Sequence, residues 1–128
     1  GYLVTTVLDR FQSDDKTLLV LDTSVNHHPK LFEYQLQPAL AEERAGARQS
    51  AVLVGSSCLA GDVFGEYRFE RMPAVGERLL FTDVGAYSLI KASRFNGYGL
   101  PAVYCWRHGR ATLLKTDEYA DFRQQWAV

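Results

Sequence analysis

Residues 51–69 read AVLVGSSCLAGDVFGEYRF, and this stretch decides the fold class. The apolar run at residues 51–54 and the alternating pattern at residues 67–69 are typical of short β-strands. Between them lie glycines, serines and an aspartate, residue types that turns favour. The stretch therefore predicts two strands joined by a turn of small residues, and it puts the thiol of Cys58 on that turn.

The same period of about two recurs along the chain. The further strands that it predicts are residues 3–8, 18–21, 78–82, 102–106 and 111–114. Between the last two lies Arg107-His108-Gly109-Arg110, where glycine can adopt a positive φ, so a hairpin is expected there. Many short strands with such turns predict a mainly β domain, an antiparallel β-barrel or sandwich.

Two stretches depart from the β pattern. Residues 42–49 are polar and alanine-rich, and we expect a loop rather than a helix. Residues 117–126 carry aromatic side chains at spacings of three and four behind a candidate cap, Asp117. This spacing predicts a short C-terminal helix packed on the sheet through Tyr119, Phe122 and Trp126.

Composition limits what the chain can be. With 128 residues, 47% of them hydrophobic, residues 1–128 can bury one core and are expected to form a single domain. The net charge is -1 and the basic residues are scattered, which argues against nucleic acid or anionic membrane as a partner. No apolar run approaches the roughly 20 residues of a membrane span and no signal peptide is recognisable, so we expect a cytoplasmic protein.

The cysteines and histidines do not predict a metal site. Cys58 and Cys105 are too few for a disulfide framework and lack zinc-site spacing, so both are expected to be free thiols. Cys105 lies between two aromatic residues of an expected strand, where a core-filling role is expected. His27 and His28 are adjacent, and on an extended segment they point to opposite faces, which disfavours a shared metal ion.

Three ordered motifs resemble those of a known family. They are Cys58-Leu59-Ala60-Gly61-Asp62, Gly85-Ala86-Tyr87, and Phe95-Asn96-Gly97 followed by Leu100-Pro101. In this order they resemble the carboxyl-terminal β-domain of the fold-type III decarboxylases, which depend on pyridoxal phosphate and act on ornithine, diaminopimelate or carboxynorspermidine. The stretches Leu21-Asp22-Thr23-Ser24 and His28-Pro29 are most similar to the carboxynorspermidine branch.

The resemblance implies a β-barrel like the C-terminal domain of alanine racemase. Family members are much longer and hold the cofactor on a Schiff-base lysine in a TIM barrel, for which this chain has neither the length nor the βα alternation. The chain therefore resembles one domain of a longer enzyme, inactive alone, with that lysine outside it. In the family this domain also receives a strand from the amino terminus, so an exposed sheet edge is expected without it.

The resemblance gives roles to two residues. After decarboxylation an acid must protonate the correct carbon, and this role falls to Cys58, since a thiol with its ordinary pKa of about 8.5 can donate near neutrality. The alternative is a small buried hydrophobe. Tyr87 resembles a tyrosine whose hydroxyl reaches the cofactor phosphate, and the alternative is a half-buried sheet aromatic. Both residues serve sites between subunits in the family, which implies a homodimer in which this domain completes the neighbour's TIM-barrel site.

Three further residues are candidates for binding the substrate. Asp22 matches a position where relatives place an acid against the distal amine, but it can equally form an Asx turn at a strand end. Asp62 could face a substrate amine or cap a short helical turn. Phe95 could form an apolar wall beside the substrate. His28 could line the mouth of the site or lie in a surface loop.

The substrate class is suggested by Leu59. Diaminopimelate-type and ornithine-type members have an acid directly after the cysteine, whereas Leu59 suits a carboxylated polyamine. We therefore expect the β-domain of a decarboxylase acting on a basic amino acid or a carboxynorspermidine-like polyamine. The alternatives are a decarboxylase of diaminopimelate, ornithine or a siderophore or antibiotic precursor, a catalytically silent relative that binds a partner, and an unrelated β-barrel binding module.

Overall fold

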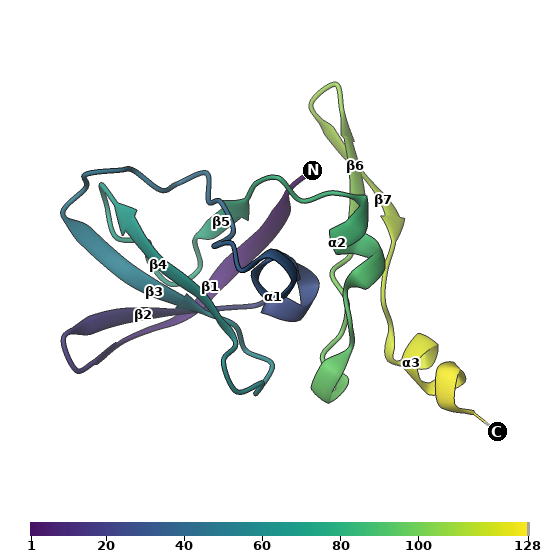
Figure 1. The fold of residues 1–128 in the computed structure, drawn as a ribbon. Coiled ribbons are helices and arrows are strands. Elements are labelled where there is room, and N and C mark those ends of the chain that lie inside the picture. The colour runs from purple at the N-terminus through teal and green to yellow at the C-terminus, as the bar shows by residue number, and fades with distance from the viewer. Residues whose placement is uncertain (128) are drawn as a thin grey trace.

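A computed structural model describes residues 1–127, which are built mainly of strands (Figure 1). The strands are β1 (Leu3–Ser13), β2 (Lys16–Leu21), β3 (Gln49–Val54), β4 (Val63–Phe69), β5 (Arg78–Phe81), β6 (Val103–Arg107) and β7 (Arg110–Lys115). The helices are α1 (Lys30–Tyr34), α2 (Ala86–Lys91) and α3 (Tyr119–Trp126), with 3₁₀ turns η1 (Val25–His27) and η2 (Phe95–Gly97). All seven predicted strands are present, most of them longer than predicted, and residues 42–49 contain no helix, as expected.

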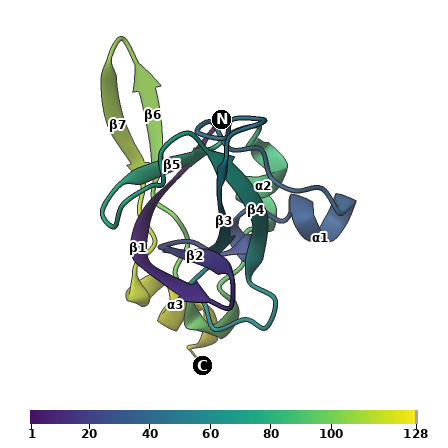
Figure 2. The ribbon, with the colours of Figure 1, turned by 90° about the vertical axis from the view of Figure 1, so that its left-hand side faces the viewer.

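Five strands form one curled sheet in the order β4-β3-β2-β1-β5. Neighbouring strands are antiparallel except β2 and β3, which run parallel with Leu19 opposite Leu53. The long strand β1 curves across the sheet, pairing with β5 through its first half and with β2 through its second (Figure 2). The prediction of a mainly antiparallel β-domain is confirmed, and residues 1–127 contain no TIM barrel.

Residues 37–41 bridge the two edge strands, β4 and β5. Leu40 forms an isolated β-bridge with Phe81 on β5. On the other side the hydroxyl of Tyr67, on β4, donates a hydrogen bond of 2.5 Å to the carbonyl oxygen of Pro38. Burial raises the pKa of the Tyr67 hydroxyl, which keeps it protonated and able to donate. The segment thereby closes the barrel between the two edges of the sheet.

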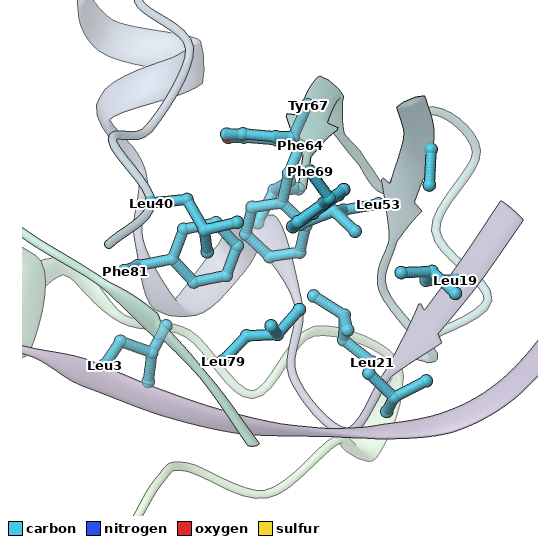
Figure 3. Close-up of a cluster of buried hydrophobic side chains, with 13 residues drawn as sticks. Leu3, Leu19, Leu21, Leu40, Leu53, Phe64, Tyr67, Phe69, Leu79 and Phe81 are labelled. Atoms are coloured by element: carbon cyan, nitrogen blue, oxygen red, sulfur yellow. The ribbon is translucent and has the colours of Figure 1, made fainter. Parts of the chain in front are cut away.

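The core fills the inside of the curled sheet, where side chains from facing strands meet (Figure 3). Three residues of β4 point inward: Phe64 (1% exposed), Tyr67 and Phe69. Tyr67 and Phe69 are two residues apart, as expected for a strand, whereas Phe64 and Tyr67 are three apart because a β-bulge lies between them. The Phe64 and Phe81 rings stack with centroids 4.6 Å apart, which joins β4 to β5. The buried cluster is Leu3, Val7, Leu19, Leu21, Val25, Leu40, Ala51, Leu53, Phe64, Tyr67, Phe69, Leu79 and Phe81.

Strands β6 and β7 form a separate two-stranded ribbon that stands away from this core (Figures 1 and 2). The predicted hairpin is confirmed, with φ of 50° at His108 and 73° at Gly109. The core-filling role predicted for Cys105 is wrong, because this thiol is only half-buried and its neighbours Tyr104 and Trp106 are exposed. Within residues 1–127 no other strand or helix packs over the ribbon, so its alternation of apolar residues predicts strands but not buried side chains.

The C-terminal helix is present, but it is neither capped nor packed as predicted. Glu118, not Asp117, is its N-cap and forms a capping box with Asp121. None of the residues of α3 is buried, and Tyr119 and Trp126 are exposed. Figure 1 shows α3 beyond the end of the ribbon, away from the five-stranded sheet. No helix of the described chain is long and apolar enough to cross a membrane.

The two adjacent histidines are buried, so the surface-loop alternative for His28 is wrong. His27 is 5% exposed and His28 is fully buried. A hydrogen bond of 2.9 Å joins His27 Nδ1 to the hydroxyl of Thr23, and one of 3.1 Å joins His28 Nδ1 to the hydroxyl of Ser88. Burial lowers the pKa of both imidazoles, and both are therefore neutral at pH 7.

Truncation of Phe81 is expected to destabilise the barrel strongly. In the Phe81→Ala variant the stacking partner of Phe64 is lost and a cavity is left, which costs about 3–5 kcal/mol of unfolding free energy. The same change at Phe32, which is 54% exposed on α1, should cost no more than about 0.5 kcal/mol. Urea denaturation followed by circular dichroism measures both, and equal losses would contradict the core described above.

Acidification is expected to destabilise the fold through the buried histidines. The unfolded chain takes up protons on these residues as the pH falls through about 6.5, whereas the folded chain resists until a lower pH. The unfolded state then binds more protons, so the free energy of unfolding decreases below pH ~6.5. The His28→Gln variant should lose less thermal stability than the wild type between about pH 7.5 and 5.5. His108→Gln, on the exposed hairpin, is the control, and identical pH profiles for all three proteins would refute the assignment.

Candidate functional site

Cys58 lies exposed on the turn between β3 and β4. Its φ is 59°, in the left-handed region that costs a residue other than glycine about 1–2 kcal/mol. The predicted position of the thiol, on a turn directly after an apolar strand, is confirmed, and the alternative of a buried hydrophobe is wrong. Leu59 is half-buried and packs against the core, so part of its role is structural.

Asp62 anchors this turn from beneath. The residue is 6% exposed, and its Oδ1 accepts a hydrogen bond of 2.8 Å from the backbone N–H of Val25, the first residue of η1. Its Oδ2 accepts hydrogen bonds from the backbone N–H of Ser57, at 3.3 Å, and from the Ser57 hydroxyl. The predicted cap of a helical turn following Gly61 is wrong, because β4 begins directly after Asp62. The carboxylate instead joins the Cys58 turn to the first N–H of η1, whose N-cap is Ser24.

Gly55 leaves the space that the Asp62 carboxylate occupies. A Cβ at Gly55 would lie 2.3–2.5 Å from the three atoms of that carboxylate, closer than any real contact. The backbone N–H of Gly55 also donates to the Asp62 carbonyl oxygen at 2.8 Å, which closes the turn at its base. Glycine is therefore required at position 55, because any side chain there would clash with the Asp62 carboxylate.

The η2 turn lies against the Cys58 turn. The side-chain amide of Asn96 donates a hydrogen bond of 3.0 Å to the carbonyl oxygen of Ser57. The hydroxyls of Tyr98 and Ser56 lie 2.6 Å apart and share a hydrogen bond. The predicted tight turn is present, with φ of 61° at Asn96. The structure thereby joins two of the three sequence motifs.

Tyr87 lies in the first turn of α2. It is 75% exposed and is not a half-buried sheet aromatic. The hydrogen bond between Ser88 and His28, 3.1 Å long, ties α2 to η1, and the ion pair between Lys91 and Glu33, 2.8 Å long, ties it to α1. The Glu33 carboxylate also raises the pKa of the Lys91 amine.

A cavity of about 210 Å³ lies between α1 and α2, with Tyr87 in its wall. Lys30 lines it as a cation, and Glu33 and Asp83 line it as anions. Its charges are therefore mixed, and Tyr87 contributes the aromatic surface and a hydroxyl. No cluster of three or more histidine, cysteine or acidic side chains suited to a metal ion occurs in residues 1–127.

Asp22 lies beside the Cys58 turn, because the carbonyl oxygen of the next residue, Thr23, accepts a hydrogen bond of 3.1 Å from Ser56. The Asp22 side chain forms no Asx turn with the residues after it. Its Oδ1 instead accepts hydrogen bonds from the hydroxyl of Thr5, at 2.6 Å, and from the backbone N–H of Thr6, at 2.7 Å. Both donors are on β1, so Asp22 ties the end of β2 to the neighbouring strand.

Phe95 is the first residue of the η2 turn and is 51% exposed, so about half of its surface is accessible to another molecule. Sequence reasoning missed the residues behind this turn. Arg94 and Asp117 form an ion pair, and Tyr98 reaches the Cys58 turn. The position of Asp117 just before a helix marked it in the sequence, but we interpreted it as a helix cap and not as a partner of Arg94. Arg94 and Tyr98 carried no local pattern that pointed to a site.

Comparison with known proteins agrees with the motifs. Residues 1–85 match the family described as pyridoxal-dependent decarboxylase, C-terminal sheet domain. Over 129 aligned residues, 98% of this chain and 33% of the relative, the chain is 37% identical to carboxyaminopropylagmatine decarboxylase of Synechocystis sp.. Over 95% of this chain and 36% of the relative, it is 30% identical to the carboxynorspermidine/carboxyspermidine decarboxylase of Campylobacter jejuni. The chain spans about a third of the length of these curated relatives.

Solved structures share the fold. Carboxynorspermidine decarboxylase of C. jejuni, crystallised with norspermidine, superposes with a TM-score of 0.90 at 27% identity, covering 98% of this chain and 38% of that one. Diaminopimelate decarboxylase of M. jannaschii, crystallised with L-lysine, superposes with a TM-score of 0.81 at 23% identity, which shows the common fold alone. The expected resemblance is confirmed, including its carboxynorspermidine-like character. The chain belongs to the pyridoxal-dependent decarboxylases, as their C-terminal sheet domain.

Proposed function

We propose that this chain serves a decarboxylase of carboxylated polyamines, and that Cys58 is its proton donor. The observation that carries the proposal is the exposed Cys58 thiol, held in a left-handed backbone conformation above the buried Asp62 carboxylate. Strain of this kind persists where the surrounding structure fixes it, often at functional sites. The two curated relatives described above support the substrate class, because their names specify carboxylated polyamine derivatives.

The described residues fit pyridoxal phosphate through Tyr87. This side chain is exposed at the start of α2, and its hydroxyl can donate a hydrogen bond to a phosphate oxygen. The lysine that would hold the cofactor covalently belongs to the barrel domain, outside this chain. When bound, the cofactor supplies an electron sink that makes loss of carbon dioxide possible. This chain contributes a phosphate contact and an acid.

The exposure of Cys58 supports the proposed proton step. Its Sγ gives a proton to the carbon that has lost carbon dioxide, and solvent returns a proton to the sulfur, so the thiol is restored after each turnover. A thiol is protonated at neutral pH yet acidic enough to donate. The fixed backbone of the turn directs the proton to one carbon, which matters because the electron pair is shared over several atoms.

Asp22 and Phe95 are proposed to contact the substrate. Only one oxygen of the Asp22 carboxylate bonds to β1, and the residue is exposed, so the carboxylate can pair with a distal amine. The exposed Phe95 ring offers an apolar wall for the methylene chain. Asp62 was also a candidate for this role, but both of its oxygens are engaged and it is buried. We assign it to holding the Cys58 turn.

A homodimer is proposed to complete the site. Large apolar side chains are exposed on α2, η2, the β6–β7 ribbon and α3, which lie together on one side of the molecule (Figure 1). An exposed set of this size marks an interface in soluble proteins. In the proposal, the barrel domain of a second copy covers it. The residues are Tyr87, Leu89, Ile90, Phe95, Tyr104, Trp106, Leu113, Leu114, Tyr119 and Trp126.

Removal of the Cys58 thiol should impair turnover by the full-length parent enzyme loaded with pyridoxal phosphate. For Cys58→Ala we expect kcat to fall by about 10²–10⁴, because the proton donor is lost. Carbon dioxide release and product identity are measured on carboxynorspermidine, carboxyaminopropylagmatine, ornithine, lysine and diaminopimelate. Cys105→Ala, on the ribbon, is the matched control and should retain wild-type turnover.

Either of two results would overturn this assignment. Full activity and the correct product from Cys58→Ala would remove the thiol from the mechanism. A wild-type protein that turns over none of the five substrates and shows no cofactor absorbance would remove the decarboxylase activity itself, and a silent binding relative would be the better account.

Removal of the Tyr87 hydroxyl should weaken cofactor binding. A hydrogen bond to a charged group is worth about 1.5–3 kcal/mol, so Tyr87→Phe should raise the dissociation constant of pyridoxal phosphate roughly 10-fold to 150-fold. The measurement is a fluorescence titration of the full-length apoenzyme. Tyr2→Phe, at an exposed tyrosine outside the proposed interface and outside the cavity beside Tyr87, should bind as the wild type does. Unchanged affinity in Tyr87→Phe would exclude a phosphate contact by this hydroxyl.

A further inference from the structure

The Asp117 carboxylate is nearly buried although it follows the exposed strand β7. Its side chain is 6% exposed. The guanidinium of Arg94 donates to its Oδ1 through two nitrogens, with Nε at 2.9 Å, and the backbone N–H of Leu100 donates to its Oδ2 at 2.9 Å. The Arg94 guanidinium lowers the pKa of Asp117, which keeps the carboxylate charged at neutral pH. Asp117 thus holds both ends of the loop formed by residues 94–100.

The same loop touches the Cys58 turn between those two ends. Asn96 donates to the carbonyl oxygen of Ser57, and Tyr98 shares a hydrogen bond with the hydroxyl of Ser56. The two serines are the residues immediately before the cysteine. The contacts therefore form a continuous path from Asp117, through the loop, to the backbone that sets the direction of the thiol.

The buried apolar cluster contains none of the residues on this path. Among residues 94–127 none belongs to the buried cluster, whose last member is Phe81. Asp62 fixes the Cys58 turn from beneath, and the loop fixes it from the side. Loss of the side support can change the position of the thiol while the barrel stays folded.

We propose that Asp117 is a positioning residue for Cys58, acting through the loop of residues 94–100. This inference rests on the proposed role of Cys58 as proton donor, but its physical content is separate: the geometry and accessibility of the thiol depend on a carboxylate in the last quarter of the chain. Arg94 also contacts Gln125 of α3, at 3.3 Å, so the C-terminal helix has a second, exposed connection to the same loop.

The test measures the thiol itself in the full-length parent enzyme. Cys58 is alkylated with iodoacetamide in the cofactor-free protein, and its rate constant is followed by mass spectrometry of the Cys58 peptide. In Asp117→Asn the ion pair is lost and only one acceptor oxygen remains, so the side chain can no longer accept from both the Arg94 guanidinium and the N–H of Leu100. We therefore expect alkylation about fivefold faster than in the wild type. In the loaded enzyme kcat should fall at least as much, with KM unchanged, because the proton donor and not substrate binding is affected.

Glu77→Gln is the matched control. It neutralises the acid of another arginine–carboxylate pair, Arg71 with Glu77, which lies in the exposed region before β5 and away from the site. Its alkylation rate and kcat should equal those of the wild type. If Asp117→Asn behaves like this control, the inference is wrong.

Asn96→Ala provides an independent arm should Asp117→Asn fail to fold. It removes the contact between the loop and Ser57 while leaving the Asp117 ion pair intact, and it should also accelerate alkylation. An unchanged rate in Asn96→Ala would overturn the inference. If instead Cys58→Ala proves fully active while both variants still accelerate alkylation, the proton-donor role fails and the positioning of the thiol by the loop stands.

Discussion

The site depends on one buried carboxylate. Asp62 bonds to Val25, 37 residues away along the chain, and to Ser57 within its own turn. A buried charge without donors is unfavourable by several kcal/mol, so the η1 segment and the Cys58 turn must both be in place whenever the domain is folded. Gly55 makes this possible by leaving the space that a side chain would fill. The position of the thiol thus follows from the need to satisfy a carboxylate.

Two kinds of structure meet around that anchor. The barrel is held by apolar side chains from five strands and by the segment that bridges β4 and β5. The residues with proposed functions lie on short turns and one short helix outside it, and polar contacts hold them: Asn96 to Ser57, Ser88 to His28, and Asp117 to Arg94. Core packing fixes where these turns start and end, and hydrogen bonds fix how their side chains point.

Sequence-based prediction succeeded for features set by neighbouring residues and failed for features set by contacts between distant parts of the chain. Alternation of apolar residues revealed all seven strands, and small residues put Cys58 on a turn, because both signals are local. Alternation does not say whether a second layer covers a strand, so Cys105 was placed in a core that the ribbon lacks. Asp117 was expected to cap the helix beside it, but it binds Arg94, 23 residues earlier. The motifs made Tyr87 a candidate through a resemblance alone, and no local pattern could show that the Asp62 carboxylate would be buried against η1.

The bridge between Leu40 and Phe81 has a consequence for how the chain matures. Since the last member of the buried cluster in residues 1–127 is Phe81, every member of that cluster has been synthesised before the ribbon begins. The ribbon and the last helix are synthesised afterwards, onto a domain that already has its interior. Their exposed aromatic residues take no part in that interior, so sequence changes there can alter the surface that the domain presents while the buried cluster keeps its composition.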